Sequence, residues 1–158
     1  MSKNHLVQKV KVQGIKIVSV RKQQNMIEFL STLYREHKCS IDELKDEMNK
    51  SRRTIFRMIE QVDRYSVIVK HSLPNSCIQL YFNRKLNEKK LDSVFEDNKE
   101  TPLVYLFLKS LIREIKISEI QTMFDCSEFE AKRMRNLIFD TTAYGDMEYD
   151  EKDLDDEE

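Results

Sequence analysis

Glycine and proline are scarce in this sequence, with two of each among 158 residues, and tryptophan is absent. This scarcity excludes a loop-rich, collagen-like or Gly-linker protein and favours helices joined by short turns. The hydrophobic share of 40% can still support a folded core, although 35% of the residues are charged. The expected fold class is mainly α with a minor β part (α+β), in one ordinary domain or two small ones.

Cysteine and histidine are also few, three of each, and they lie far apart. An odd number of scattered cysteines predicts no disulfide framework. His37 and Cys39 come closest to a metal-ligand pair, but no second pair at zinc-finger spacing completes it, so we expect no metal and no cofactor. The sequence also lacks an apolar run of about 18 residues and a signal-peptide stretch, so we expect a cytoplasmic protein without a membrane partner.

Charge is distributed unevenly along the chain. The net charge is −1, but residues 146–158 hold nine acids against one lysine, and residues 1–145 hold 26 basic against 19 acidic residues, a net of +7. A basic body suggests a polyanion as its partner, whereas a solvated lysine-rich surface would explain the excess without one. The acidic tail, residues 144–158, is expected to be disordered on composition.

Hydrophobic periodicity predicts the elements of the first half. Residues 6–21 alternate β-branched and polar side chains around Gly14, which predicts one or two N-terminal β-strands. Ser40 and Glu43 form a capping-box pattern, and Ser51 is a second good N-cap. Helices are expected over 24–36, from 41 to about 49 and over 52–65, followed by a β-hairpin with strands within 66–70 and 77–82. This order is typical of a winged helix-turn-helix, in which the hairpin is the wing.

The second half is expected to repeat the helix pair. Polar residues 85–100 favour a linker helix, and Thr101 with Pro102 opens a strongly apolar helix over 103–115. Beyond it, a shift of 76 residues matches Ile41 to Ile117 and Ser51 to Ser127. We therefore expect tandem helix-turn-helix units, with domains at 1–84 (N-terminal strands and winged helix-turn-helix), 85–100 (linker helix), 101–143 (second unit) and 144–158 (tail).

The helix expected over 52–65 carries an arginine-rich face. Its apolar residues share one arc of the helical wheel, the arginines lie almost opposite, and Glu60 is the one acid among them. Arginine can bond guanine bidentately in the major groove, and a serine at a helix N-terminus can meet a phosphate. A solvated face is the alternative. The predicted DNA-binding residues are Ser51, Arg52, Arg53, Thr54, Arg57, Gln61 and Arg64, with Lys70, His71, Arg84 and Lys85 in and after the wing.

The matching positions of the second unit change character. Glu128 and Phe129 stand where the first unit has Arg52 and Arg53, and a carboxylate near phosphate is repelled. The second unit is therefore expected to bind protein, including its own copy, rather than sequence-specific DNA. Because helix 103–115 is the expected dimer or interdomain element, the predicted protein-interaction residues are Phe129, Arg133, Leu108 and Ile112.

The residues from Cys39 to Glu60 resemble the N-terminal winged helix-turn-helix of Mga-like bacterial transcription regulators. The recognition helix of that group often opens with serine, a short polar stretch, then Thr, Ile or Leu, an aromatic residue and Arg. Here the pattern is Ser51-Arg52-Arg53-Thr54-Ile55-Phe56-Arg57. The resemblance implies a regulator with paired helix-turn-helix units and a recognition helix at 52–65. It covers about residues 24–82, with a weaker extension to 140. The sequence lacks the large sugar-transport-like regulatory domains of full Mga-type regulators, which suggests a small stand-alone regulator of plasmid or phage origin.

Together these features favour a sequence-specific DNA-binding transcription regulator that reads a repeated site as a homodimer. Two alternatives stay open: a protein-binding inhibitor or adaptor from a mobile element on the same scaffold, and a plasmid replication initiator, since initiators also use tandem winged helices. An enzyme is not expected. The sequence has no Gly-rich phosphate loop, no Ser/His/Asp or Cys/His pattern and no metal-ligand spacing.

Overall fold

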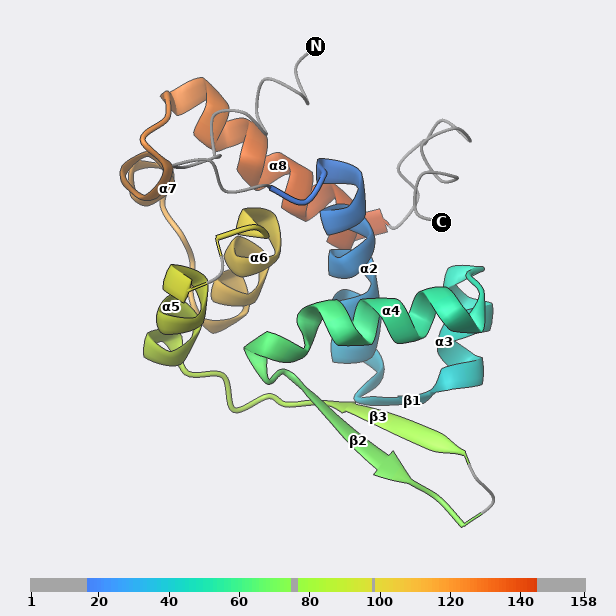
Figure 1. The fold of residues 1–158 in the computed structure, drawn as a ribbon. Coiled ribbons are helices and arrows are strands. Elements are labelled where there is room, and N and C mark those ends of the chain that lie inside the picture. Colours follow the sequence, from blue (N-terminus) through green and yellow to red (C-terminus); the bar gives the residue numbers. More distant parts are fainter. Residues whose placement is uncertain (1–16, 75–76, 98, 145–158) are drawn as a thin grey trace. The chain divides into compact units, whose positions relative to one another are not determined.

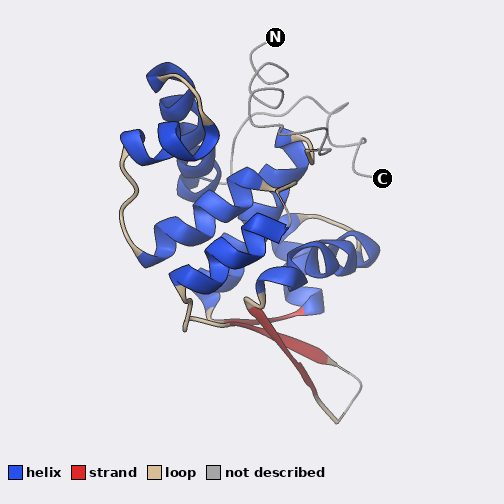
Figure 2. Cartoon of the chain, turned by 60° about the vertical axis from the view of Figure 1, so that its left-hand side comes forward, coloured by secondary structure: helices blue, strands red, loops and turns tan. Residues whose placement is uncertain are grey.

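The computed structural model describes residues 17–74, 77–97 and 99–144, with side chains described up to residue 138 (Figure 1). These residues form seven α-helices, one short 3-10 helix and a three-stranded antiparallel sheet (Figure 2). The prediction of a mainly α fold with a minor β part is confirmed. None of the described helices combines the length and the apolarity needed to cross a membrane.

The described chain divides into two compact units. We call residues 28–86 the hairpin unit, and residues 17–27 together with 87–144 the helical unit. Helix α2, Val20–Glu36, begins in the helical unit and ends in the hairpin unit. After α2, the hairpin unit contains β1 (Lys38–Ser40), α3 (Ile41–Met48), α4 (Arg52–Val62), the 3-10 helix η1 (Asp63–Tyr65), β2 (Ile68–Ser72) and β3 (Ile78–Phe82).

Helices α3 and α4 begin at the two predicted serine caps. Ser40 Oγ accepts from the backbone N of Glu43 at 3.0 Å, while Glu43 Oε1 accepts from the backbone N of Ser40 at 2.7 Å, so the capping box is confirmed. Ser51 Oγ accepts from the backbone N of Thr54 at 3.1 Å. Between the helices, Asn49 adopts a left-handed conformation with φ 54° and ends α3. Asparagine tolerates this conformation better than most residues, which allows the tight turn.

The predicted hairpin is confirmed, and a third strand joins it. Strand β2 pairs antiparallel with β3, with Ile68 opposite Phe82. Strand β1 pairs with the other side of β3, which gives the order β1-β3-β2 and leaves β2 at the edge of the sheet. The sequence did not predict β1 because three residues between two helices carry no usable periodicity. Apolar side chains from α2, α3, α4 and β3 supply the core of the unit, including the fully buried Leu33, Leu44, Ile55, Val62 and Leu80.

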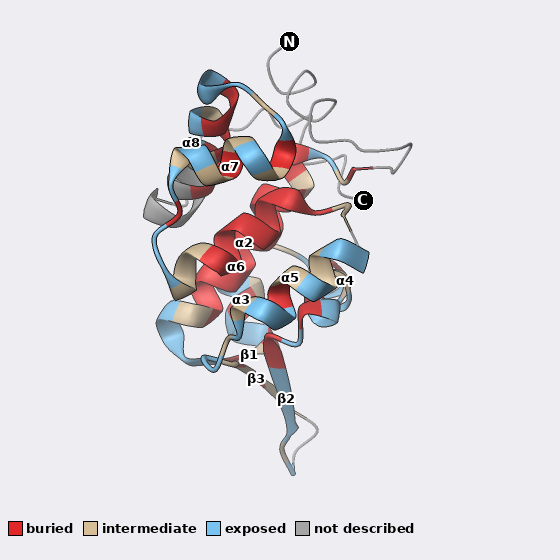
Figure 3. Cartoon of the chain, turned by 90° about the vertical axis from the view of Figure 1, so that its left-hand side faces the viewer, coloured by how far each residue is buried: buried red, intermediate tan, exposed pale blue. Residues whose placement is uncertain are grey.

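The helical unit is built around α6 (Pro102–Ile112), which is buried at every residue from Pro102 to Lys109 (Figure 3). Gln23 Oε1 accepts from the backbone N of Leu103 at 2.7 Å, which satisfies a donor that the start of α6 leaves unpaired. The remaining helices are α5 (Glu88–Asp97), α7 (Ile117–Phe124) and α8 (Glu128–Tyr144). Helices α5 and α8 pack against α6, and α7 packs against α8.

The N-terminal strand prediction needs correction where the structure tests it. Residues 6–16 lie outside the described residues, but 17–21 form no strand, because α2 begins at Val20 instead of residue 24. The cause is a local cap, since Ser19 Oγ accepts from the backbone N of Lys22 at 3.2 Å. The alternation of valine with polar residues therefore predicted a strand for residues 20 and 21, which instead belong to a helix.

Other predicted boundaries shift at helix ends. The helix predicted over 103–115 stops at Ile112, where Arg113 takes an extended backbone conformation. The helix predicted over 52–65 ends at Val62, and residues 63–65 form η1. Helix α5 forms within the segment expected to be a linker helix, and its Leu91 is buried. Of the tail predicted over 144–158, residues 145–158 lie outside the described residues.

Candidate nucleic-acid interface

Helix α4 separates an apolar face from a polar one. Ile55, Met58, Ile59 and Val62 are buried, as the helical wheel predicted. On the other side, Arg53 is exposed and has no ion-pair partner among the described residues, and Arg57 is half-buried. This spacing aims the two guanidinium groups away from the core of the unit.

Arg52 opens the exposed face and is partly engaged. Its Nη1 lies 3.3 Å from Asp42 Oδ1 of α3, with 51% of the Arg52 side chain and 71% of the Asp42 side chain exposed. An ion pair this exposed contributes at most about 1 kcal/mol, so a phosphate can replace the carboxylate at small cost. The guanidinium carbon also lies over the ring of Phe56, 5.3 Å from its centroid. Phe56 was not among the predicted site residues, although its side chain is 37% exposed.

Thr54 is buried, although it was predicted to lie on the exposed surface. It is only 4% exposed, and its Oγ1 lies 2.9 Å from Ser51 Oγ. The prediction that Thr54 contacts DNA is therefore corrected, because the side chain is occupied at the cap of α4. Ser51 itself is exposed at the helix N-terminus.

The remaining predicted residues of this helix and the wing are spread over three elements. Gln61 is half-buried at the end of α4, and Arg64 is exposed in η1 rather than in the helix. Lys70 and His71 are exposed on the edge strand β2. The His71 ring meets the Tyr81 ring edge to face, with centroids 5.7 Å apart, which restricts the imidazole on the surface of the hairpin.

Arg84 and Lys85 follow the hairpin and have different surroundings. The Arg84 guanidinium lies over the Tyr34 ring at 4.0 Å from its centroid and also donates to the backbone O of Tyr34. Arg84 therefore ties the segment after β3 to the end of α2, a contact that the sequence did not reveal. Lys85 is exposed.

Charge is segregated within the hairpin unit. Residues 51–86 contain seven basic and two acidic residues, whereas residues 28–50 contain four basic and six acidic residues. Four of those acids lie on the exposed part of α3, so a polyanion is attracted to α4 and the hairpin and repelled by α3. The first set consists of Arg52, Arg53, Arg57, Arg64, Lys70, Arg84 and Lys85 against Glu60 and Asp63; the acids of α3 are Asp42, Glu43, Asp46 and Glu47.

Cys39 lies beside these acids of α3 and does not suit metal or nucleophile chemistry. It lines a depression of about 370 Å³ together with Glu43, Asp46 and Glu47. Burial, with a smaller contribution from Glu43, raises the pKa of the Cys39 thiol to about 11, so the thiol stays protonated at neutral pH. Among the described residues, no group of three His, Cys, Asp or Glu side chains could hold a metal ion.

The residues predicted for protein interaction do not form one surface. Phe129 is 72% exposed in the first turn of α8, and Arg133 and Ile112 are half-buried. Leu108 has no exposed surface, because α6 is covered on all sides at that position. The prediction that Leu108 lies in a dimer contact is therefore corrected.

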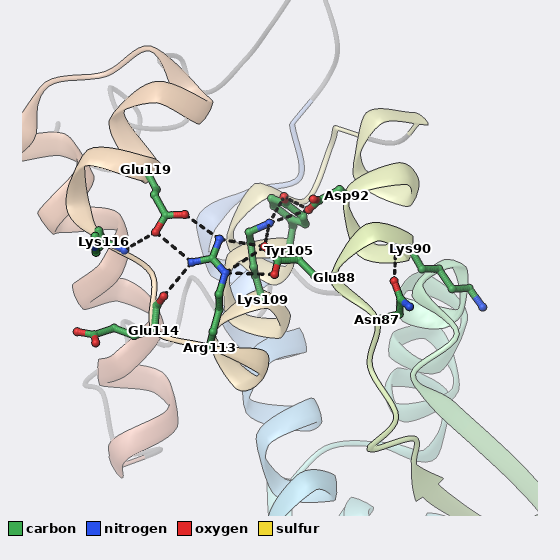
Figure 4. A network of polar contacts seen from close by, with 10 residues as sticks. All are labelled: Asn87, Glu88, Lys90, Asp92, Tyr105, Lys109, Arg113, Glu114, Lys116 and Glu119. Carbon is green, nitrogen blue, oxygen red and sulfur yellow. Dashed lines mark hydrogen bonds and ion pairs between the residues drawn. The ribbon is translucent and has the colours of Figure 1, made fainter.

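The helical unit contains a cluster of charged residues that the sequence did not predict (Figure 4). Lys109 is 5% exposed, and its Nζ lies 2.8 Å from Glu88 Oε2 and 2.7 Å from Asp92 Oδ1. Arg113 bonds Glu88 and also bonds Glu119 bidentately, at 3.0 and 2.7 Å. The spacing of Tyr105, Lys109 and Arg113 by four residues was an available signal, since it places polar groups on one side of an otherwise apolar segment.

The protonation states within this cluster follow from its contacts. Hydrogen bonds from Arg113 and Lys109 lower the pKa of Glu88 to about 2, and Arg113 lowers that of Glu119 to about 2. Burial alone would lower the pKa of Lys109, but its bonds to Asp92, Glu88 and Tyr105 raise it above the usual value. Burial and the bond to Asp92 raise the pKa of Tyr105 to about 12. At neutral pH Glu88 and Glu119 are therefore ionised, Lys109 is protonated and Tyr105 is neutral. The hydrogen-bond donors and acceptors of the cluster satisfy one another.

A cavity of about 590 Å³ adjoins the cluster, with Phe95, Tyr105 and Phe124 among its lining residues. The Phe95 and Tyr105 rings stack at 4.2 Å, and Phe124 meets Phe95 edge to face at 6.0 Å. Because the charged groups beside the cavity are paired with one another, they hold α5, α6 and α7 together rather than offer free charge to a ligand.

No family model, no curated protein and no solved structure matches this chain.

Proposed function

We propose that this protein is a sequence-specific DNA-binding transcription regulator that contacts double-stranded DNA through α4, with the β2–β3 hairpin as the wing of a winged helix-turn-helix. The single observation that carries the proposal is the set of arginines on the outward face of α4, Arg52, Arg53 and Arg57. Arg64 in η1 and Lys70 on the edge strand β2 add exposed positive charge to the same unit. A helix placed this way can enter the major groove with its N-terminal residues against base edges.

The order of the elements supports the winged-helix part of the proposal. A helix, a short strand, two capped helices and a hairpin follow one another, with sheet order β1-β3-β2. That order is usual for winged helices. In such a module the second helix of the pair is the one that reads DNA, and here it is α4.

The electrostatics of α4 support a polyanion as the partner. Arg53 and Arg57 project from the side opposite the buried apolar residues, and the ion pair of Arg52 is with an exposed carboxylate. Ser51 is exposed at the N-terminus of α4, and the backbone N–H groups at this end of the helix can bind a phosphate. Because the acids of α3 repel DNA, DNA should approach this unit at α4 and the hairpin.

A gel-shift titration at two salt concentrations tests the proposal. The wild-type protein should bind duplex DNA and lose affinity steeply as salt rises, because each phosphate contact releases a counterion. Arg53→Ala and Arg57→Ala should each weaken specific binding by about 1–3 kcal/mol without loss of helical circular dichroism. Arg35→Ala, which removes an exposed arginine outside the proposed interface, is the matched control and should bind like wild type. If both α4 variants bind like wild type, α4 is not the DNA-reading helix.

A protein-binding adaptor is the second candidate, and one observation favours it. Phe129 is 72% exposed on α8, and a large apolar side chain in water favours a protein partner, including a second copy of the chain. Absence of duplex binding at both salt concentrations would favour this candidate over the regulator.

A further inference from the structure

The polar face of α4 contains one large apolar side chain, that of Phe56. It is 37% exposed, and the only other large exposed hydrophobic residues in the described part of the chain are Val69 and Phe129. Its neighbours Ile55 and Ile59 are almost fully buried, so the ring is not part of the same core face. An aromatic ring left partly in water forgoes hydrophobic free energy that a contact could recover.

Phe56 lies in the middle of the proposed reading surface. It is three residues after Arg53 and four before Glu60, so on a helix the three side chains are neighbours. All three are exposed. Phe56 thus stands between a guanidinium donor and a carboxylate acceptor.

The ring is held in place from one side. The Arg52 guanidinium lies over it, 5.3 Å from the centroid, and the same Arg52 is 3.3 Å from Asp42. This chain of contacts from α3 to α4 limits the rotamers of Phe56 before any partner arrives. A pre-positioned apolar group suits recognition, because less side-chain entropy is lost on binding.

Major-groove chemistry offers one matching group. Of the four bases only thymine presents a methyl group there, and apolar side chains, phenylalanine included, contact it. Resting on the proposed function, we propose that Phe56 is a specificity-determining residue that contacts the C5-methyl group of a thymine in the duplex site. Arg53 is then placed to bond a guanine, and Glu60 to accept from the amino group of a cytosine.

The helix geometry sets the spacing of these bases. Arg53 and Phe56 are separated by three residues, which is about 4.5 Å along a helix axis, and base pairs in DNA are about 3.4 Å apart. The thymine read by Phe56 should therefore lie within one or two base pairs of the guanine read by Arg53.

The test removes the methyl group and nothing else. The preferred duplex is first selected from a random library with the full-length protein, and each thymine is then replaced by deoxyuridine in turn. At one thymine, wild-type affinity should fall about fourfold, the loss expected for about 0.8 kcal/mol per buried methyl group. Phe56→Ala should bind the thymine and deoxyuridine duplexes equally. Val69→Ala, which shortens an exposed apolar side chain on β2, is the control and should keep the fourfold loss.

The outcomes separate this inference from the proposed function. A protein that selects and binds a duplex but is insensitive to every deoxyuridine substitution, or selects a site without thymine, overturns the role of Phe56 alone. A deoxyuridine loss that persists in Phe56→Ala overturns it as well. Absence of any duplex binding removes the proposed function, and the thymine contact with it. If Phe56 instead inserts between base pairs or binds protein, methyl removal has no effect, which is the first of these outcomes.

Discussion

The two helix pairs of this protein, α3–α4 and α7–α8, share their backbone plan and differ in their surfaces. A shift of 76 residues relates the starts of α3 and α7 and those of α4 and α8. In both turns the residue after the first helix is left-handed, Asn49 with φ 54° and Asp125 with φ 51°. The serine caps also match, because Ser51 and Ser127 each accept from the backbone N three residues later at 3.1 Å.

The difference lies in what each second helix exposes. Residues 52–65 contain four arginines and two acids, whereas residues 128–141 contain three basic and three acidic residues. Phe129 occupies the place of Arg53 and is 72% exposed. Caps and apolar positions can therefore keep the backbone of a helix pair while the exposed side chains change. In our proposal, the partner then changes from a polyanion at the first pair to a protein at the second.

The unit that contains the second pair is also held together by the ion pairs of Lys109, and the largest expected effect tests this. Lys109→Met removes the ammonium group that joins Glu88 and Asp92 in the helical unit. We expect the free energy of unfolding to fall by about 2–3 kcal/mol, less than for a fully buried pair, because both carboxylates keep some water. Urea unfolding measures this. Lys132→Met, which breaks the exposed pair with Glu128, should change stability by less than about 0.5 kcal/mol. Equal stability of the two variants would remove the anchoring role of Lys109.

An intermediate effect is expected when the second pair is given the surface of the first. Glu128→Arg combined with Phe129→Arg restores the arginines of positions 52 and 53 on α8. Affinity for random duplex DNA should rise about tenfold, and the slope of log affinity against log salt should steepen by up to about two. Glu128→Gln with Phe129→Gln, which adds no cation, is the control and should give a smaller rise. No gain in the arginine variant would mean that backbone differences, not side chains, separate the two pairs.

The smallest effect concerns acid and the ion pair between Arg113 and Glu119 of α7. Arg113 lowers the pKa of Glu119 from 4.5 to about 2, so the charged form of Glu119 stabilises the folded state. That contribution is present above about pH 4.5 and is lost as the pH falls towards 2. The stability difference between wild type and Glu119→Gln should be below about 1 kcal/mol at pH 7 and should vanish across this window. In an Arg113→Met background the same substitution should show a smaller pH dependence, because only the bond from the backbone N of Lys116 still lowers the pKa of Glu119. An undiminished pH dependence would mean that Arg113 is not the main cause.

Local signals explain which parts of the fold could be predicted. Ser40 and Glu43 specify a cap within four residues, and the β-rich runs around the turn specify the hairpin, so both predictions were correct. Strand β1 was not predicted, because its three residues acquire their conformation only from pairing with β3. The start of α2 failed because valine alternation outweighed the Ser19 cap in the sequence analysis.

The residues of the candidate site also divide into those that could be predicted from the sequence and those that could not. Arg53 and the buried face of α4 could be assigned from the helical wheel, since position on one helix is a local property. The burial of Thr54, the contact of Arg84 with Tyr34 and the exposure of Phe56 could not, because each depends on neighbours elsewhere in the chain.

By itself the sequence determined where α3 and α4 begin, which of their faces are apolar and where positive charge gathers, because caps, periodicity and composition act over a few residues. Only the tertiary structure decided that Leu108 is enclosed, that Lys109 is neutralised by Glu88 and Asp92, and that Arg52 lies between Asp42 and Phe56. The physical reason is that burial and ion pairing depend on distances between elements, and those distances are set when the elements pack together.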